Sequence, residues 1–377
     1  MAYVDVKPEI LIWAANRVGG IEVLVNRFPK LYEWINDKKQ PTLKQLESFA
    51  KATATPLGYF FLTKPPEDKF IIPHYRTVAD RETEKPSMEL LDTIHTMQRR
   101  QEWMKDYLIE NGINPLTFVG SADLTDEPKQ VAKKIRKELG LHNDWASKKG
   151  TWEGALRDLI RKIEDIGILV MINGVVGNNN HRKLNVHEFR GFVLIDDYAP
   201  LIFINGADGK AAQMFTLAHE LAHIWYGYSA IFDLEKLQPA DDDIEHACNQ
   251  TAAEFLVPEN EFLKAWKDCA EDMERYQKMA RHFKVSELVI VKRAYDLSLI
   301  SKEMYFDHYH QRNIAAKARK NSRADFYATQ SLKLGRRFSQ AVINNVKSGK
   351  LLYRDAYRLT GLYGNTFEKF AEHLGEV

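Results

Sequence analysis

Cysteine and long apolar runs are scarce in this sequence. The two cysteines, Cys248 and Cys269, are too few for a disulfide framework, and no Cys-x-x-Cys zinc spacing occurs. No segment approaches the roughly 18 apolar residues of a membrane span, and the charged N-terminus is unlike a signal peptide. We therefore expect a cytoplasmic protein with no membrane partner.

An excess of charge of either sign is also missing. The 53 Lys and Arg residues nearly balance the 52 Asp and Glu residues, which leaves a formal net charge of +1. Such a chain has no global field that draws it onto nucleic acid, so any contact of that kind must be local. Its 377 residues are enough for about two or three domains.

The hydrophobic pattern is mostly helical, with one region where it is typical of β-strands. The stretches GILVMING and EFRGFVLIDDYAPLIFING are rich in β-branched and aromatic residues, which predicts two or three strands of a small sheet. Helical periodicity resumes near residue 209. We predict an α+β fold, mostly α, with a module of short helices at 1–65, a linker and charged helical region at 66–148, a domain containing the sheet at 149–270, and a helical C-terminal region at 271–377.

The stretch FTLAHELAHIWYG, residues 215–227, places polar groups in an apolar helix. His219 and His223 are four residues apart, so one turn of helix brings their imidazoles onto one face, where both can bind the same ion. Glu220 lies on the neighbouring flank, from which its carboxylate can reach a water on that ion. Because a bound Zn²⁺ satisfies polar atoms that an apolar helix cannot, the pattern predicts one zinc ion per chain.

Zinc needs a third protein ligand, and the helical segment DDDIEHACNQTAAEFLVP offers several donors. Glu245 and Glu254 are nine residues apart and lie on opposite faces of this helix. Glu245 shares its face with Asn249 and a small residue, which favours a close approach to the histidines, whereas Glu254 is expected at solvent or in a surface ion pair. His246 and Cys248 remain rival donors, and Cys248 as a fourth ligand would make the site structural.

Three motifs in this order resemble those of a known family. EFRGFVLIDDYAPLIFIN, FTLAHELAHIWYG and E-x-x-C-N-x-x-A-A-E-F-L-V-P from Glu245 to Pro258 are similar to motifs of the ImmA/IrrE metallo-endopeptidases, specifically the longer members that begin with a Cro/C1-type helix-turn-helix. The resemblance implies a gluzincin-like zinc peptidase domain at 149–270 and places the third ligand at Glu245. In such a site Glu220 is the catalytic base, and Asn249, one turn after Glu245, is expected to orient a ligand.

The resemblance also implies a role in gene control. Family members are associated with cutting a partner repressor in phage, mobile-element and stress responses, and toxin-antitoxin loci carry such proteins. We therefore expect a zinc-dependent endopeptidase that acts on a repressor or antitoxin, with a toxin as a further candidate partner. The alternative is a DNA-binding transcriptional regulator or antitoxin whose peptidase fold is a sensing or docking scaffold. A pure scaffold has no need of Glu220, which favours the enzyme.

The N-terminal module departs from the pattern of the family. Members usually have Glu-x-Gly after the recognition helix, whereas residues 34–39 here are WINDKK, and NRFPKL resembles a shortened turn. Lys30, Lys38 and Lys39 are the candidate contacts to DNA phosphates. A solvated face explains these lysines equally well.

Other segments have two interpretations each. The strand LIFIN, residues 201–205, is expected at an edge of the sheet, where it pairs with an extended substrate or simply with another strand. The polar loop 177–187 either borders the cleft or is a solvated hairpin loop, and the basic segment 312–323 is a nucleic-acid contact or a charged helix end.

The aromatic residues of the tail have helical spacings that predict core positions for Phe326, Tyr327, Phe338, Tyr353 and Tyr357. The candidate oxyanion donors are His181, His187, Arg190, Tyr226, Tyr228 and His246.

Overall fold

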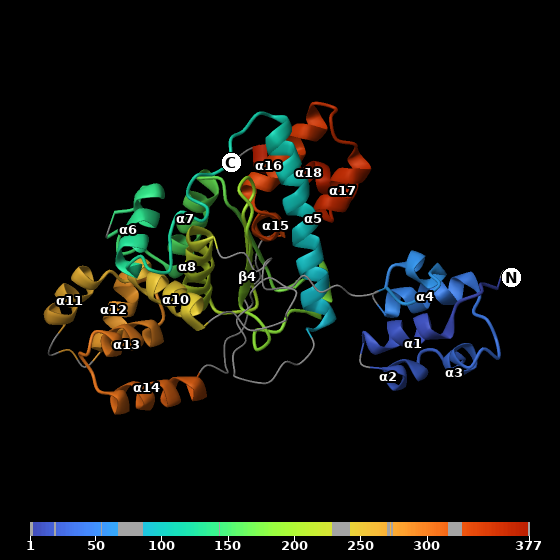
Figure 1. The fold of residues 1–377 in the computed structure, drawn as a ribbon, viewed down its shortest axis with the longest axis horizontal. Helices are drawn as coiled ribbons and strands as arrows, with labels where there is room; N and C mark the ends of the chain where they lie inside the picture. The colour runs from blue at the N-terminus through green and yellow to red at the C-terminus, as the bar shows by residue number, and fades with distance from the viewer. Residues whose placement is uncertain are drawn as a thin grey trace. The chain divides into compact units, whose positions relative to one another are not determined.

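A computed structural model gives the fold of most of the chain. Its contacts divide the protein into two compact units, Met1–Phe70 and Ile71–Val377 (Figure 1). The second unit contains nearly all of the three regions that the sequence analysis separates after residue 65, and the boundaries between those regions stay a prediction. The described residues are 3–18, 20–53, 55–66, 86–142, 144–227, 242–269, 272, 274–315 and 326–375.

The N-terminal unit consists of short helices, as the sequence predicts. They are α1 (Pro8–Asn16), α2 (Ile21–Val25), α3 (Leu31–Ile35), α4 (Leu43–Ala52) and the 3₁₀ helix η1 (Leu57–Phe61). At the start of α4, Thr42 and Gln45 form a capping box in which each side chain accepts a hydrogen bond from the backbone N–H of the other residue. The ring of Phe49 makes T-shaped contacts with Phe28, Trp34 and Phe60 at centroid distances of 5.3, 6.2 and 5.8 Å, which forms the core of this unit.

The second unit contains a three-stranded sheet of order β1-β5-β4. Its strands are β1 (Leu169–Asn173), β4 (Gly191–Leu194) and β5 (Leu201–Asn205). β5 pairs in parallel with β1 and in antiparallel with β4, so LIFIN is the central strand and its prediction as an edge strand is wrong. All five residues of β5 are buried, and an unbroken apolar run is the pattern of a strand covered on both faces.

Helices cover both faces of this sheet. Ile202 and Ile204 of β5 belong to the large core of the unit, whereas Phe203 between them stacks on Phe192 of β4. α7 and α8 pack against each other and the sheet, and α5 contacts β5.

The mostly helical α+β fold is confirmed, and no described helix combines the length and apolarity needed to cross a bilayer. The helices are α5 (Met88–Glu110), α6 (Pro128–Glu138), α7 (Trp152–Asp165), α8 (Lys210–Tyr226), α10 (Asp242–Leu256), α11 (Glu259–Asp268), α12 (Arg275–Phe283), α13 (Glu287–Asp296), α14 (Lys302–Ala315), α15 (Phe326–Leu334), α16 (Arg336–Lys347), α17 (Tyr353–Thr360) and α18 (Asn365–Gly375).

The C-terminal helices cover the outer edge of β1. The N–H of Leu169 donates to the carbonyl of Pro200, on the β5 side, so the next carbonyl, that of Val170, points away from β5. A Cβ added to Gly335 would lie 2.7 Å from this oxygen, and α15 packs against β1. α15 therefore covers the β1 edge of the sheet and not the β4 edge.

A buried arginine joins the C-terminal helices to α5. Arg100 donates to the backbone carbonyls of Lys333 and Leu359, at 3.2 and 2.9 Å, in the last turns of α15 and α17. These carbonyls carry partial negative charge, which compensates the buried guanidinium. Burial nevertheless lowers the pKa of Arg100 to about 10.

The polar segment 177–187 belongs to a hairpin of β2 (Val175–Val176) and β3 (Asn179–Lys183). Arg182 forms ion pairs with Glu89 and Asp92 of α5, and Asn178 donates to the carbonyl of Gly361 after α17. The hairpin therefore connects α5 to the C-terminal helices.

The predicted core positions of the tail aromatics are only partly correct. Phe338 of α16 is fully buried, whereas Phe326 and Tyr353 are 50% and 52% exposed. A helical spacing shows that two side chains share a face, but it does not show whether another helix covers that face. The basic segment 312–323 lies mostly outside the described residues.

The helix that carries the histidine motif, α8, ends in a tight contact. Gly227 forms its left-handed C-cap, with φ of +62°. The N–H of Gly120 donates to the carbonyl of Ile224 at 2.9 Å, which satisfies one of the free carbonyls at this helix end. A Cβ added to Gly227 would lie 2.4 Å from the Cα of Gly120, so this position requires glycine.

Gly227→Ala is expected to destabilise the protein by about 2 kcal/mol or more, because alanine must adopt the left-handed conformation and also displace the backbone of Gly120. Gly349→Ala is a matched control, since φ there is +73° but no atom lies within 4 Å of an added Cβ. The control should lose only the backbone strain of about 1 kcal/mol. Urea unfolding measures both losses, and equal losses would show that the contact with Gly120 is unimportant.

Glu164, in the last turn of α7, is buried beside the start of α16. It is 4% exposed, and its Oε1 accepts a hydrogen bond from the backbone N–H of Arg337 at 3.2 Å. Burial raises its pKa from 4.5 to about 7. The folded protein therefore holds this carboxyl protonated at a pH where the unfolded chain has already ionised it.

The free energy of unfolding should fall by up to about 3 kcal/mol as the pH rises from about 4.5 to about 7, because ionisation of Glu164 costs more in the folded state. Glu164→Gln removes this ionisation and keeps an acceptor for Arg337. The variant should gain stability relative to wild type at about pH 8 and not at about pH 4.5, as measured by urea unfolding. Glu153→Gln, on the exposed side of α7, is the control. A parallel pH dependence in wild type and Glu164→Gln would contradict the assignment.

Candidate metal centre

One turn of α8 brings two imidazoles together. His219 and His223 are 2% and 1% exposed, and their Nε2 atoms lie 3.1 Å apart. Leu217, Leu221, Ile224 and Trp225 of the same helix are buried and Phe215 is partly buried, so the helix docks into the core while the two rings share one face.

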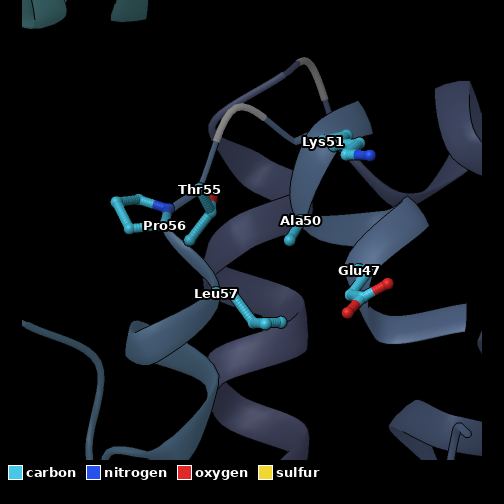
Figure 2. Close-up of a pocket in the computed structure, with 6 residues that line it drawn as sticks. All are labelled: Glu47, Ala50, Lys51, Thr55, Pro56 and Leu57. Carbon is cyan, nitrogen blue, oxygen red and sulfur yellow. The ribbon is translucent and has the colours of Figure 1, made fainter. Parts of the chain in front are cut away.

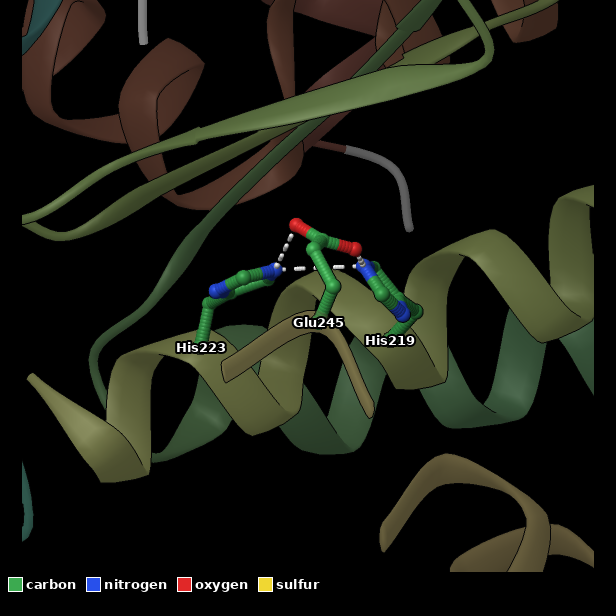
Figure 3. A group of neighbouring side chains, drawn as sticks. All are labelled: His219, His223 and Glu245. Carbon is green, nitrogen blue, oxygen red and sulfur yellow. Dashed lines mark hydrogen bonds and ion pairs between the residues drawn. The ribbon is translucent and has the colours of Figure 1, made fainter. Parts of the chain in front are cut away.

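The third group comes from α10. Glu245 Oε2 lies 3.1 Å from His219 Nε2, and Glu245 Oε1 lies 3.3 Å from His223 Nε2 (Figure 3). The hydroxyls of Tyr226 and Thr251 lie 3.0 Å apart, in a hydrogen bond that joins the end of α8 to α10. The structure thus brings together the three residues that the sequence analysis proposes as metal ligands.

These groups lie close enough together to share one ion. The two Nε2 atoms are 3.1 Å apart, each has one carboxylate oxygen of Glu245 within 3.3 Å, and one ligand atom from each residue lies within 4.8 Å of the other two. Two imidazoles and a carboxylate are also the donor set of catalytic zinc sites that leave one position for water. Within the described part of the chain, this is the one group of three or more potential ligands whose atoms gather in this way.

Burial and charge oppose each other at the centre. Burial favours the neutral form of Glu245, but the rings of His219 and His223 donate to its carboxylate and hold its pKa well below the usual range. Burial raises the pKa of the Cys248 thiol, and the carboxylates of Glu245 and Glu220 raise it further. The structure therefore favours an ionised carboxylate and a protonated thiol, of which only the carboxylate is ready to bind zinc.

The rival donors of α10 do not join the cluster. Cys248 is fully buried among the apolar residues of the core. His246 lies on an exposed side of the helix, where its Nε2 is 2.8 Å from Nε2 of Gln250. Both residues are described, and both fall outside the group of potential ligands. A structural site closed by Cys248 is therefore not supported.

Glu220 lies against the edge strand β4. It is 2% exposed, and a Cβ added to Gly191 would lie 3.3 Å from Glu220 Oε1 and 2.6 Å from Thr216 Cγ2. Gly191 is thus the residue that lets the strand approach the motif helix, a role that the sequence analysis did not assign. The signal was present, since a glycine inside a strand often marks a close approach of another segment.

Glu254 is not at the surface, and its predicted position is wrong. It is 9% exposed, pairs with Arg293 of α13, and accepts a hydrogen bond from the backbone N–H of Glu259 at the start of α11. Arg136 of α6 donates to the carbonyl of the next residue, Phe255. This network fixes the second half of α10, whose first half supplies the candidate metal ligand.

Asn249 and the candidate oxyanion donors have no demonstrated role at the centre. The Oδ1 atom of Asn249 is buried and accepts no hydrogen bond from the described residues, and its expected role in orienting a ligand stays a prediction. Tyr226 is engaged with Thr251, and Arg190 pairs with Asp208 at 3.4 Å. His181 and His187 are exposed, and Tyr228 lies outside the described residues.

The described residues of the N-terminal unit offer no comparable site. Lys30, Lys38 and Lys39 are exposed, and Lys39 pairs with Glu33 of α3 at 2.7 Å. An open hollow of about 570 Å³ in this unit combines one acid and one base with mostly apolar residues, without convergent polar groups, so we assign it no function. It is lined by Glu47, Ala50, Lys51, Thr55, Pro56 and Leu57 (Figure 2).

Glu245→Gln is expected to weaken zinc binding by about 100-fold or more, because a neutral amide is a poorer ligand than a carboxylate. Cys248→Ala, on the same helix, is the matched control and should keep wild-type affinity. Competition with a chelator measures zinc affinity in both variants. Loss of zinc from Cys248→Ala together with its retention by Glu245→Gln would refute the ligand assignment.

Comparisons with known proteins support a peptidase domain. Residues 334–373 match a domain of unknown function, DUF8813. No curated protein matches the chain. Residues 163–295 match the peptidase family described as the IrrE N-terminal-like domain, and this segment contains the sheet, α8 and α10. The match supports the resemblance to the ImmA/IrrE family and a peptidase activity for residues 163–295.

Proposed function

We propose that the chain is a zinc-dependent endopeptidase. The observation that carries the proposal is the convergence of His219, His223 and Glu245, with Glu220 of the same helix turn beside a sheet edge. The match to the IrrE-like peptidase family supports the same activity.

The residues of the centre have separate tasks in hydrolysis. His219, His223 and Glu245 would hold zinc, which when bound polarises the scissile carbonyl and lowers the pKa of water. Glu220 accepts the proton of the attacking water and returns it to the leaving amine. Its burial against β4 limits the directions in which this carboxylate can turn.

β4 is the strand that an extended substrate would use. The N–H of Asn205 donates to the carbonyl of Arg190, so the backbone groups of the next residue, Gly191, point away from β5. A peptide that adds to this edge pairs through backbone hydrogen bonds and passes close to Glu220. The pairing role expected for LIFIN thus moves to β4.

A cytoplasmic repressor or antitoxin is the substrate class that we propose from the ImmA/IrrE resemblance, with a toxin as a further partner. The N-terminal unit would be the Cro/C1-like module, with Lys30, Lys38 and Lys39 near DNA phosphates. The alternative, a DNA-binding regulator with a scaffold fold, has less support. A scaffold gains nothing from Glu220, and burying a carboxylate without a task costs stability.

Glu220→Gln is expected to lower kcat by about 10²- to 10⁴-fold and to leave the zinc content unchanged. Zinc-loaded protein is incubated with denatured casein and with the products of adjacent genes, and cleavage is followed by mass spectrometry. Glu153→Gln, an exposed glutamate of α7, is the control and should cleave like wild type. Absence of cleavage by the wild type, or equal cleavage by Glu220→Gln, would reject the proposal.

A further inference from the structure

Positive charge is concentrated in the C-terminal helices α15–α18. Residues 326–375 contain eight Lys and Arg residues against three Asp and Glu residues, in a chain whose formal net charge is only +1. None of these side chains belongs to the metal centre. Most of this region matches a domain of unknown function that does not overlap the peptidase match. The region therefore carries a local excess of positive charge outside the peptidase match.

α17 contains two Tyr-Arg pairs, one turn of helix apart. Tyr353 and Tyr357 lie one turn apart on one flank of the helix, and Arg354 and Arg358 lie on the adjoining flank. Figure 1 shows α17 among the C-terminal helices. The arginine side chains are 75% and 80% exposed, and each has Asp355 as an ion-pair partner, at 3.5 and 3.9 Å. Such exposed pairs are weak, so both guanidiniums can turn to a stronger anion.

The tyrosine rings beside these arginines are open to solvent. Tyr353 and Tyr363 are 52% and 66% exposed. Their ring centroids lie 6.0 and 5.8 Å from that of Tyr357, and Phe367, which is buried, lies 6.2 Å from Tyr353. Rings that are supported by packed neighbours and remain exposed are suited to stacking on other planar groups.

The inner side of α17 is fixed to the rest of the unit. Arg100 donates to the carbonyl of Leu359 at 2.9 Å, and Asn178 donates to the carbonyl of Gly361 at 3.2 Å. These contacts hold the helix while Tyr353, Arg354 and Arg358 stay exposed. A surface that is already ordered loses little conformational entropy when it binds a partner.

We propose that residues 350–363 form a binding surface for single-stranded nucleic acid. Lys350, Arg354 and Arg358 contact phosphates, and Tyr353 and Tyr363 stack on unpaired bases. Cations alone would suit any polyanion, but exposed rings on the same segment favour a strand whose bases are free to stack. A duplex keeps its base faces inside and cannot use the tyrosines in this way.

Fluorescence anisotropy with the full chain and labelled DNA and RNA single strands of about 20 nucleotides tests this surface. The wild type should bind both strands, with an affinity that falls as salt rises. Arg354→Glu combined with Arg358→Glu should weaken binding by about 10-fold or more and reduce the salt slope by about 1.4, since each phosphate contact contributes about 0.7. Tyr353→Ala combined with Tyr363→Ala should also weaken binding by about 10-fold or more, whereas Phe at both positions should retain it.

The controls separate this surface from the N-terminal unit and from general charge. Tyr3→Ala removes another exposed tyrosine, and Arg157→Glu with Arg161→Glu reverses two exposed arginines one turn apart on α7; neither change should alter single-strand binding. Circular dichroism and thermal unfolding verify that each variant is folded. Absence of wild-type binding at low salt, or unchanged binding in the arginine and tyrosine variants, overturns the proposal. Equal affinity for a duplex or for polyglutamate also overturns it, in favour of a general polyanion or an acidic protein.

Discussion

The contact between α8 and α10 is the interaction on which the candidate function depends. Two histidines from one helix turn supply only two ligands, and α10 carries Glu245 to within 3.3 Å of both rings. A shift of α10 by one residue would rotate this carboxylate by about 100°, so the register of the two helices matters as much as the ligands themselves. The bond between Tyr226 and Thr251 helps to maintain that register.

Buried charges reinforce the same arrangement from outside the centre. Glu254 of α10 pairs with Arg293 of α13, and Arg136 of α6 donates to the backbone of α10. Removing one partner of such a pair leaves an uncompensated buried charge, whereas the intact pair gives little net stability. These interactions therefore define where α10 lies more than they strengthen the fold. Gly191 and Gly227 have a comparable role at two further contacts of α8, because each permits a backbone approach that a side chain would block.

The sequence predicts features that depend on local geometry and fails where distant segments meet. The shared face of His219 and His223, and the placement of Glu245 and Glu254 on opposite faces of their helix, follow from the rotation per residue of one helix. The solvent position expected for Glu254 was wrong, because its partner Arg293 lies on another helix, 39 residues away. The central place of LIFIN was missed for a similar reason, since its pairing with β1 and β4 is decided by the whole sheet. Tyr353 shows the same limit, because helical spacing does not reveal whether a face is covered.

α15 and Gly335 cover the outer edge of β1, which affects how copies of the protein can meet at high concentration. In the three-stranded sheet, β4 pairs with β5 on one side and with no described strand on the other. Uncovered strand edges are also where identical chains join one another. A second copy that added to β4 would occupy the backbone groups that the proposed function assigns to an extended peptide, so pairing between copies and peptide binding at this edge would exclude each other.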